Sequence, residues 1–181
     1  FSAAAALLLT RGRGSRAQVL HSLREATRPG RRGIVEALCH VPLAVETARA
    51  LQAILADSGN PNLGPALDVL SFHRVLAPAA IGPAVSADMK ETRCAAARAI
   101  SRVGGDAAWI ATLIEDVDPG VRDAALAAAS RRGQPWVLEH LRSVCTDSHR
   151  VTRDAIRLLV CLGDRSDVEA LLGLVPHIDL G

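Results

Sequence analysis

Residues 119–133 read PGVRDAALAAASRRG, and related stretches lie before and after them in the chain. Residues 90–104 read KETRCAAARAISRVG, and residues 150–163 read RVTRDAIRLLVCLG. Each copy has an arginine near its start and a glycine at its end. These arginines, Arg93, Arg122 and Arg153, are 29 and 31 residues apart. The chain therefore contains a sequence repeat with a period of about thirty residues.

Each copy has the pattern of an α-helix that stops at its glycine. Alanine and leucine, which fill the copies, are strong helix formers. Gly104, Gly133 and Gly163 follow the predicted helices, where a glycine can adopt the left-handed conformation of a C-terminal cap. Residues 107–115, 135–144 and 166–175 form second predicted helices, with apolar residues at spacings of three and four. We therefore predict a helical hairpin as the repeating unit, with the arginine in its first helix.

Prolines mark the starts of two of these helices. Asp118 precedes Pro119, which places a capping carboxylate before a proline in the first helical position. The pair formed by Gln134 and Pro135 repeats the proline signal one helix later. Both pairs predict a helix that begins at the proline.

The composition agrees with a helical protein. Of 181 residues, 49% are hydrophobic and only 2% are aromatic, so the predicted core consists of small aliphatic side chains that let helices approach closely. No stretch reaches the roughly 20 apolar residues that would cross a bilayer. The cysteines are widely spaced, which indicates buried thiols and a reducing, cytoplasmic location; they are Cys39, Cys94, Cys145 and Cys161.

The first half repeats less clearly. Residues 43–57 and 62–76 are predicted to pair as a degenerate hairpin, and residues 16–28 and 33–41 as two shorter helices. The sequence RPGRRG at residues 28–33 between the shorter helices is predicted not to be helical throughout. Residues 78–87 are a proline- and glycine-containing connection. We therefore expect an N-terminal region at 1–77, the connection at 78–87, and regular repeats at 88–181.

Residues 115–129, EDVDPGVRDAALAAA, and residues 146–156, TDSHRVTRDAI, resemble the short HEAT repeats that also occur in phycobilin lyases. The resemblance covers about residues 88–175. It implies an all-α fold, a right-handed α-solenoid of antiparallel helical hairpins. Repeats of this family have an aspartate in the turn and an arginine six residues later. Two copies keep this spacing, whereas Asp88 stands five residues before Arg93.

These charged residues are expected to form a structural ladder that holds the repeats in register. Each aspartate could accept hydrogen bonds from the free amides of the next helix, and could pair with an arginine of its own or a neighbouring repeat. The predicted ladder consists of Asp116, Arg122, Asp147, Arg153 and Arg93.

Signals for catalysis or metal binding are weak. The six histidines are scattered singly, and the nearest approach to a metal site is Cys145, Asp147 and His149, where Asp147 already has a structural role. There is no Gly-x-Ser-x-Gly elbow, no glycine-rich phosphate loop of the Walker type, and no His-Glu pair of the kind used by iron-binding HEAT-like hydroxylases. We therefore predict no catalytic residue, no cofactor and no metal.

Protein binding is the expected function, since solenoid repeats expose long ridges and commonly act as scaffolds or adaptors. One candidate contact surface is the exposed flank of the first helices: Arg98, Arg102, Ser130, Arg131 and Arg157. A second is the basic front of the chain, where residues 1–60 contain eight arginines and four acidic residues. Its candidate contacts with an acidic partner are Arg11, Arg13, Arg16, Arg31 and Arg32.

The resemblance leaves two enzymatic alternatives open, a phycobilin-lyase-like and a DNA-glycosylase-like activity. An apolar pocket with convergent arginines would favour the first, and a basic groove with a tryptophan the second. Trp109 and Trp136 are instead predicted to fill the seam between repeats. Nucleic acid is not the favoured partner, because the aligned repeats share no continuous basic stripe. We also expect further repeats, or a second copy of the chain, to cover the apolar helix at residues 166–175.

Overall fold

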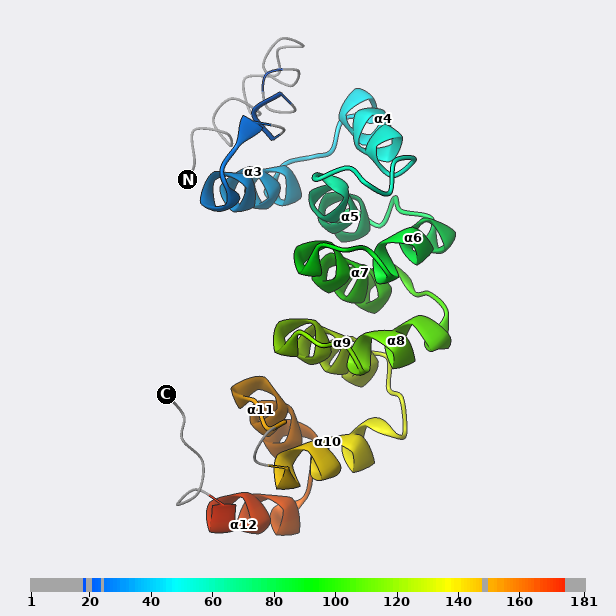
Figure 1. Ribbon diagram of the computed structural model, residues 1–181. Helices are drawn as coiled ribbons and strands as arrows, with labels where there is room; N and C mark the ends of the chain where they lie inside the picture. Colours follow the sequence, from blue (N-terminus) through cyan, green and yellow to red (C-terminus); the bar gives the residue numbers. More distant parts are fainter. Residues whose placement is uncertain (1–17, 19–20, 24, 148–149, 175–181) are drawn as a thin grey trace. The chain divides into compact units, whose positions relative to one another are not determined.

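The computed structural model describes residues 18, 21–23, 25–147 and 150–174 (Figure 1). Within these ranges the regular elements are all helices, which confirms the predicted all-α class. The chain divides into two compact units, residues 1–106 and residues 107–181.

In the first unit, α3, α5 and α7 stack side by side, and further helical elements pack against α5 and α7 (Figure 1). The middle helix, α5, contacts both α3 and α7, and it also contacts α4. The short elements η1 and α6 pack against α7. The bounds are α3 (Arg28–His40), α4 (Val45–Ile54), α5 (Leu63–Phe72), η1 (Pro78–Ile81), α6 (Gly82–Val85) and α7 (Lys90–Val103).

Small side chains allow α5 and α7 to approach each other closely. Alanines form much of the buried face of α7, where Ala95 and Ala96 have almost no exposed surface. At Gly64 on α5, an added Cβ would lie 3.2 Å from the Cα of Thr92 and 3.4 Å from the carbonyl oxygen of Glu91. The core of this unit is completed by leucines and isoleucines of all the layers, among them Leu38, Leu51, Leu67, Leu70, Ile81 and Ile100.

The second unit consists of two hairpins and a further helix. α8 packs against α9, and α10 against α11. α9 also contacts α11, while α12 contacts both α10 and α11. The bounds are α8 (Ala107–Ile114), α9 (Pro119–Arg131), α10 (Val137–Thr146), α11 (Arg153–Leu162) and α12 (Arg165–Leu174).

The predicted helices of the repeats are confirmed, but their grouping into hairpins is wrong by one helix. The helix at residues 107–115 was expected to follow its partner, whereas α8 packs against α9, which comes after it. The arginine-bearing helix is therefore the second helix of its hairpin. The physical reason is the loop between α8 and α9, whose carbonyl oxygens at Asp116 and Val117 accept hydrogen bonds from Arg122 of the following helix.

The prediction that residues 28–33 are not helical throughout is wrong. α3 runs from Arg28 to His40, so Pro29 stands in its first turn. A proline is tolerated there because its missing N–H would have no partner within the helix. Of the helix predicted at residues 16–28, residues 18, 21–23 and 25 are helical, and Arg16 lies outside the described residues.

Residues 78–87 also differ from the predicted connection. Pro78 and Pro83 each stand in the first turn of a short helical element, η1 and α6. These two elements pack against α7 as α8 packs against α9. The prolines therefore begin helical turns here and do not prevent them.

Glycine fits the ends of the three repeat helices for two different reasons. Gly104 and Gly133 have φ angles of 92° and 63°, so both have the positive φ that favours glycine. The left-handed conformation predicted at Gly163 is wrong, because its φ is −78°. Space is limiting there instead: an added Cβ would clash with the carboxylate of Asp167 and lie 2.7 Å from the carbonyl oxygen of Leu159.

The two predicted proline starts have different outcomes. Asp118 is the N-cap of α9, and its Oδ1 accepts a hydrogen bond of 2.9 Å from the N–H of Gly120. Pro135 lies in the turn before α10, which begins only at Val137. Trp136, just before α10, is 37% exposed, and its ring meets His140 edge-on. The seam role of Trp109 and Trp136 stays a prediction.

Candidate functional site

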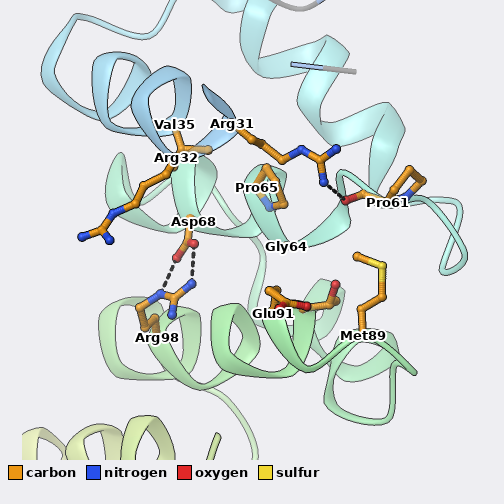
Figure 2. A pocket seen from close by; sticks show the side chains of 11 residues that line it. Arg31, Arg32, Val35, Pro61, Gly64, Pro65, Asp68, Met89, Glu91 and Arg98 are labelled. Carbon is orange, nitrogen blue, oxygen red and sulfur yellow. Dashed lines mark hydrogen bonds and ion pairs between the residues drawn. The ribbon is translucent and has the colours of Figure 1, made fainter. Parts of the chain in front are cut away.

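A hollow of about 390 Å³ opens between α3, α5 and α7 in the first unit (Figure 2). In Figure 2, α3 contributes side chains from one side and α7 from the other, with the start of α5 between them. The lining residues are Arg31, Arg32, Val35, Pro61, Gly64, Pro65, Asp68, Met89, Glu91, Thr92 and Arg98.

A second hollow of about 510 Å³ adjoins the first. The two share four lining residues, Arg32, Val35, Asp68 and Arg98. The second hollow adds residues farther along the same helices, Glu36, Cys39 and Arg102. We call the two hollows together the α3–α7 groove.

Asp68 of α5 connects the groove to α7 through two arginines. Its two carboxylate oxygens accept hydrogen bonds from Nε and Nη2 of Arg98, at 2.9 and 2.6 Å (Figure 2). Nη1 of Arg102 lies 3.3 Å from Oδ1 of the same carboxylate. The hydrogen bond to Asp68 raises the pKa of the Arg98 guanidinium. This bidentate contact joins two helices one repeat period apart.

Arg102 is held by further contacts at the same end of the groove. Its Nη1 donates to the backbone oxygen of Asp68 and to the hydroxyl oxygen of Ser71, both at 3.2 Å. Its guanidinium carbon lies 5.7 Å from the ring centroid of Phe72, within the range of a cation–π interaction. Arg102 is therefore fixed against α5.

The two arginines of α3 differ in how much they are engaged. Arg31 donates from Nη1 to the carbonyl oxygen of Pro61 and from Nη2 to that of Ala26, both at 3.3 Å. Its buried Nε has no hydrogen-bond partner among the described residues. Arg32 is exposed and forms no ion pair with any described acidic residue. Arg32 is thus the guanidinium that remains available in the groove.

Cys39 lines the charged end of the groove as a protonated thiol. Burial raises its pKa to about 11, and the negative charges of Asp68 and Glu36 act in the same direction against the positive charge of Arg102. A thiol with such a pKa is not a nucleophile at neutral pH. Cys39 therefore acts in the groove as a small, half-buried apolar side chain.

The structure combines parts of the two predicted contact surfaces. Arg31 and Arg32, from the basic front, face the same groove as Arg98 and Arg102, from the repeat ridge. Arg98 and Arg102 were expected on an exposed flank, but both are half-buried and bound to Asp68. Arg11, Arg13 and Arg16 lie outside the described residues.

The remaining predicted contact residues lie in the second unit. Ser130 is half-buried, and its hydroxyl donates to the carbonyl oxygen of Leu126 at 2.8 Å. Arg131 at the end of α9 and Arg157 on α11 are exposed. The role of these three residues in partner binding stays a prediction.

Two arginines of the predicted ladder, Arg122 and Arg93, bind backbone carbonyls. Nη1 of Arg122 donates to the carbonyl oxygens of Asp116 and Val117, at 2.9 and 3.2 Å. The Asp116 carboxylate accepts from the N–H of Asp118 at 2.9 Å, as expected of an aspartate that binds free amides. Arg122 therefore contacts the main chain of its own loop, and the pairing of the Asp116 carboxylate with an arginine stays a prediction.

Arg93 makes the same contact although its aspartate spacing is shorter. Its Nη1 donates to the carbonyl oxygens of Ala87 and Asp88, both at 2.8 Å. These carbonyls are six and five residues before Arg93, the same positions that Arg122 binds. The arginine position, not the aspartate position, is what the two copies have in common.

In the third copy, different residues connect neighbouring helices. Arg153 is exposed at the first position of α11, and the backbone oxygen of Asp147 accepts from the N–H of Arg150. The hydroxyl of Thr152 donates to Oδ1 of Asp123 at 2.6 Å, across 29 residues. Burial raises the pKa of Asp123, while the hydrogen bond from Thr152 opposes this shift. The register role of Asp147 and Arg153 stays a prediction.

A buried aspartate also holds the last helix. Asp167 of α12 is 6% exposed and accepts hydrogen bonds from Nε and Nη2 of Arg142, at 2.7 and 3.0 Å. The N–H of Asp164 donates to the same carboxylate at 2.9 Å. These contacts connect α10 to α12.

The described residues include no group of three or more histidine, cysteine or acidic side chains that could hold a metal ion. Of the three residues considered for such a site, His149 lies outside the described residues. Within the part of the chain that the structure describes, no helix combines the length and apolarity needed to cross a membrane.

Sequence reasoning missed the apolar and acidic members of the groove. Asp68, Val35, Pro65 and Met89 were not among the candidate residues. The spacing of Asp68 and Arg98, which are 30 residues apart, was a usable signal, because it equals one repeat period. The apolar members gave no signal of this kind, because they belong to separate helices and loops.

Stacked antiparallel hairpins with one recurring arginine contact define an α-helical repeat protein. Residues 78–174, more than half of the chain, match the family model for HEAT repeats. The chain therefore belongs to the HEAT repeat family. Comparisons with curated proteins and with solved structures found no match.

Proposed function

We propose that this chain is a non-catalytic scaffold or adaptor that binds another protein through the α3–α7 groove. HEAT repeats commonly mediate protein–protein interactions. The observation that carries the proposal is the groove itself, in which apolar side chains lie next to fixed and free arginines. Protein interfaces likewise have apolar centres and are enriched in arginine and methionine.

A second candidate is a phycobilin-lyase-like activity. Val35, Pro65 and Met89 form an apolar surface beside Arg31 and Arg32, and an open-chain tetrapyrrole has an apolar body with carboxylates. The DNA-glycosylase-like alternative has no comparable support, because Trp109 and Trp136 both lie in the second unit and not in the groove.

Site-specific photo-crosslinking in the source cells tests the proposal. A photo-reactive amino acid in place of Met89 would lie in the groove, and the same group in place of Gln52 is the matched control on the exposed side of α4. We expect a protein that crosslinks from position 89 and not from position 52. Equal crosslinking from the two positions would contradict the proposal.

The second candidate is tested on the same purified chain. Biliverdin is added, and its absorbance spectrum is recorded with the native chain and with an Arg32→Glu variant. Under the scaffold proposal the spectrum is unchanged. A spectral shift that Arg32→Glu abolishes, together with transfer of the bilin to an acceptor protein, would favour the lyase instead.

A further inference from the structure

We propose that the α3–α7 groove binds an extended, acidic segment of the partner protein, in which a carboxylate lies close to an apolar side chain. The proposal rests on the proposed function and names the class of partner segment. It follows from the shape of the groove, from the distribution of its charges, and from the one arginine that is not engaged.

The shape favours an extended chain over a compact ligand. The two hollows adjoin and share Arg32, Val35, Asp68 and Arg98, so an occupant of both must pass between these residues. An extended peptide advances about 3.3 Å per residue and points successive side chains in opposite directions. Such a chain could place one side chain in the first hollow and another beside the shared residues.

The first hollow forms the apolar end of the groove. Val35 of α3, Pro65 of α5 and Met89 before α7 come from three elements and face the same space (Figure 2). Met89 is 39% exposed, although burial of its side chain would be favourable. Methionine adapts to differently shaped apolar partners, because its side chain is unbranched and polarisable. An aliphatic or aromatic side chain of the partner fits this end.

The positive charge is concentrated where the hollows meet. Glu91 lines only the first hollow and Glu36 only the second, whereas Arg32 and Arg98 line both. The carboxylate of Asp68 is already bound by Arg98 and Arg102. Two guanidinium groups thus share one carboxylate, and Arg32 adds a third positive charge. A carboxylate of the partner would be attracted to this central position.

A nucleic acid fits the same groove less well. Glu91 in the first hollow and Glu36 in the second would repel the closely spaced phosphates on either side of the central arginines. No aromatic residue is among the described residues that line it, so there is no platform on which a base could stack. A peptide with isolated carboxylates avoids both problems.

Three labelled peptides of about ten residues, long enough to span both hollows when extended, serve as probes. The first repeats leucine, serine, aspartate and serine, so that a leucine and an aspartate stand two residues apart on one face of the extended chain. The second has lysine in place of aspartate, and the third has serine in place of leucine. Binding to the whole chain is measured by fluorescence anisotropy at fixed ionic strength. We expect the first peptide to bind at least about tenfold more tightly than the other two, because only it has both features.

Charge reversal locates the binding site. Arg32→Glu should weaken binding of the first peptide by about tenfold or more, whereas Arg49→Glu should change it by less than about twofold. Arg49 is the matched control, since it is exposed on α4 in the same unit and does not line the groove. Circular dichroism checks that both variants fold, and Arg32→Gln replaces Arg32→Glu if that variant does not.

Three results would overturn the proposal: tighter or equal binding of the lysine peptide, equal effects of Arg32→Glu and Arg49→Glu, or displacement of the peptide by a single-stranded RNA. Different results would contradict the proposed scaffold function. If position 89 crosslinks specifically to a protein while the peptides show no preference for aspartate, the scaffold function stands and the acidic segment is wrong. If no protein crosslinks from position 89, the scaffold function through the groove fails as well.

Discussion

At the scale of single residues, the side chain of Arg122 holds the loop that precedes its own helix. Its guanidinium donates to the carbonyl oxygens of Asp116 and Val117. Arg122→Ala would remove both hydrogen bonds, and we expect the free energy of unfolding to fall by about 1–2 kcal/mol. Urea unfolding measures the change. Arg132→Ala is the control, since Arg132 is an exposed arginine near the end of the same helical segment; equal midpoints for the two variants would exclude the loop-holding role.

The hydrogen bonds of Asp167 predict that the stability of the fold depends on pH. The hydrogen bond from Arg142, and then that from the Asp164 N–H, lower the pKa of the Asp167 carboxyl below its ordinary value of 3.8. Because the folded-state pKa is lowered, the carboxylate stabilises the fold above the unfolded-state pKa, and this contribution is lost as the pH falls through the folded-state value. The melting temperature of Asp167→Asn should therefore lie below that of the native chain at pH 7 and 5.

At pH values below 3.8 the same difference should shrink, because the native carboxylate becomes protonated too. Thermal melts followed by circular dichroism at several pH values provide the test. Glu169→Gln is the matched control on α12, since Glu169 forms only an exposed ion pair with Arg165. A difference between native chain and Asp167→Asn that is the same at every pH would show that the charge of Asp167 is not responsible.

At the scale of helices, Gly64 sets the distance between α5 and α7. An added Cβ would approach the main chain of α7 at Thr92 and Glu91, and a backbone cannot yield as a flexible side chain can. Overpacking of this kind costs about 1–3 kcal/mol. We expect Gly64→Ala to be less stable than Gly30→Ala, in which the new Cβ has only ordinary contacts at 3.6 Å. Chemical unfolding of both variants measures the difference, and equal stabilities would contradict the close packing.

At the scale of helices, the sequence predicted most elements and the pairing of α4 with α5, but it did not predict the pairing of α8 with α9. The repeated arginines and glycines predicted α7, α9 and α11 to within a few residues at each end. The pairing of α8 with α9 depends on how Arg122 binds the carbonyl oxygens of the loop between them, and the repeat period alone does not distinguish the two neighbours of a helix. Residues 28–33 are helical against the prediction, because Pro29 stands in the first turn of α3, where a proline does not break a helix.

At the scale of the whole molecule, the groove likewise could not be predicted from the sequence. Its arginines were among the candidates, but on two different surfaces, because a single sequence contains no information on which helix α3 packs against. The packing of α3 against α5, and of α5 against α7, brings Arg32 and Arg98 to one groove. Of the groove residues that the sequence analysis did not select, only Asp68 had a signal in the sequence, its distance of one repeat period from Arg98.

Each compact unit has its own buried leucines, so a core substitution should act locally. Leu67 in the first unit and Leu141 in the second have no exposed surface. Truncation of a buried leucine to alanine costs about 2–5 kcal/mol, and in repeat proteins each repeat is stabilised mainly by its neighbours. In amide hydrogen exchange with mass spectrometry, Leu67→Ala should speed exchange in α3, α5 and α7 and leave α10 and α11 near their native rates. Leu141→Ala should do the reverse. If either variant speeds exchange equally in both units, they unfold as one cooperative body, and neighbour contacts alone do not account for the stability of this chain.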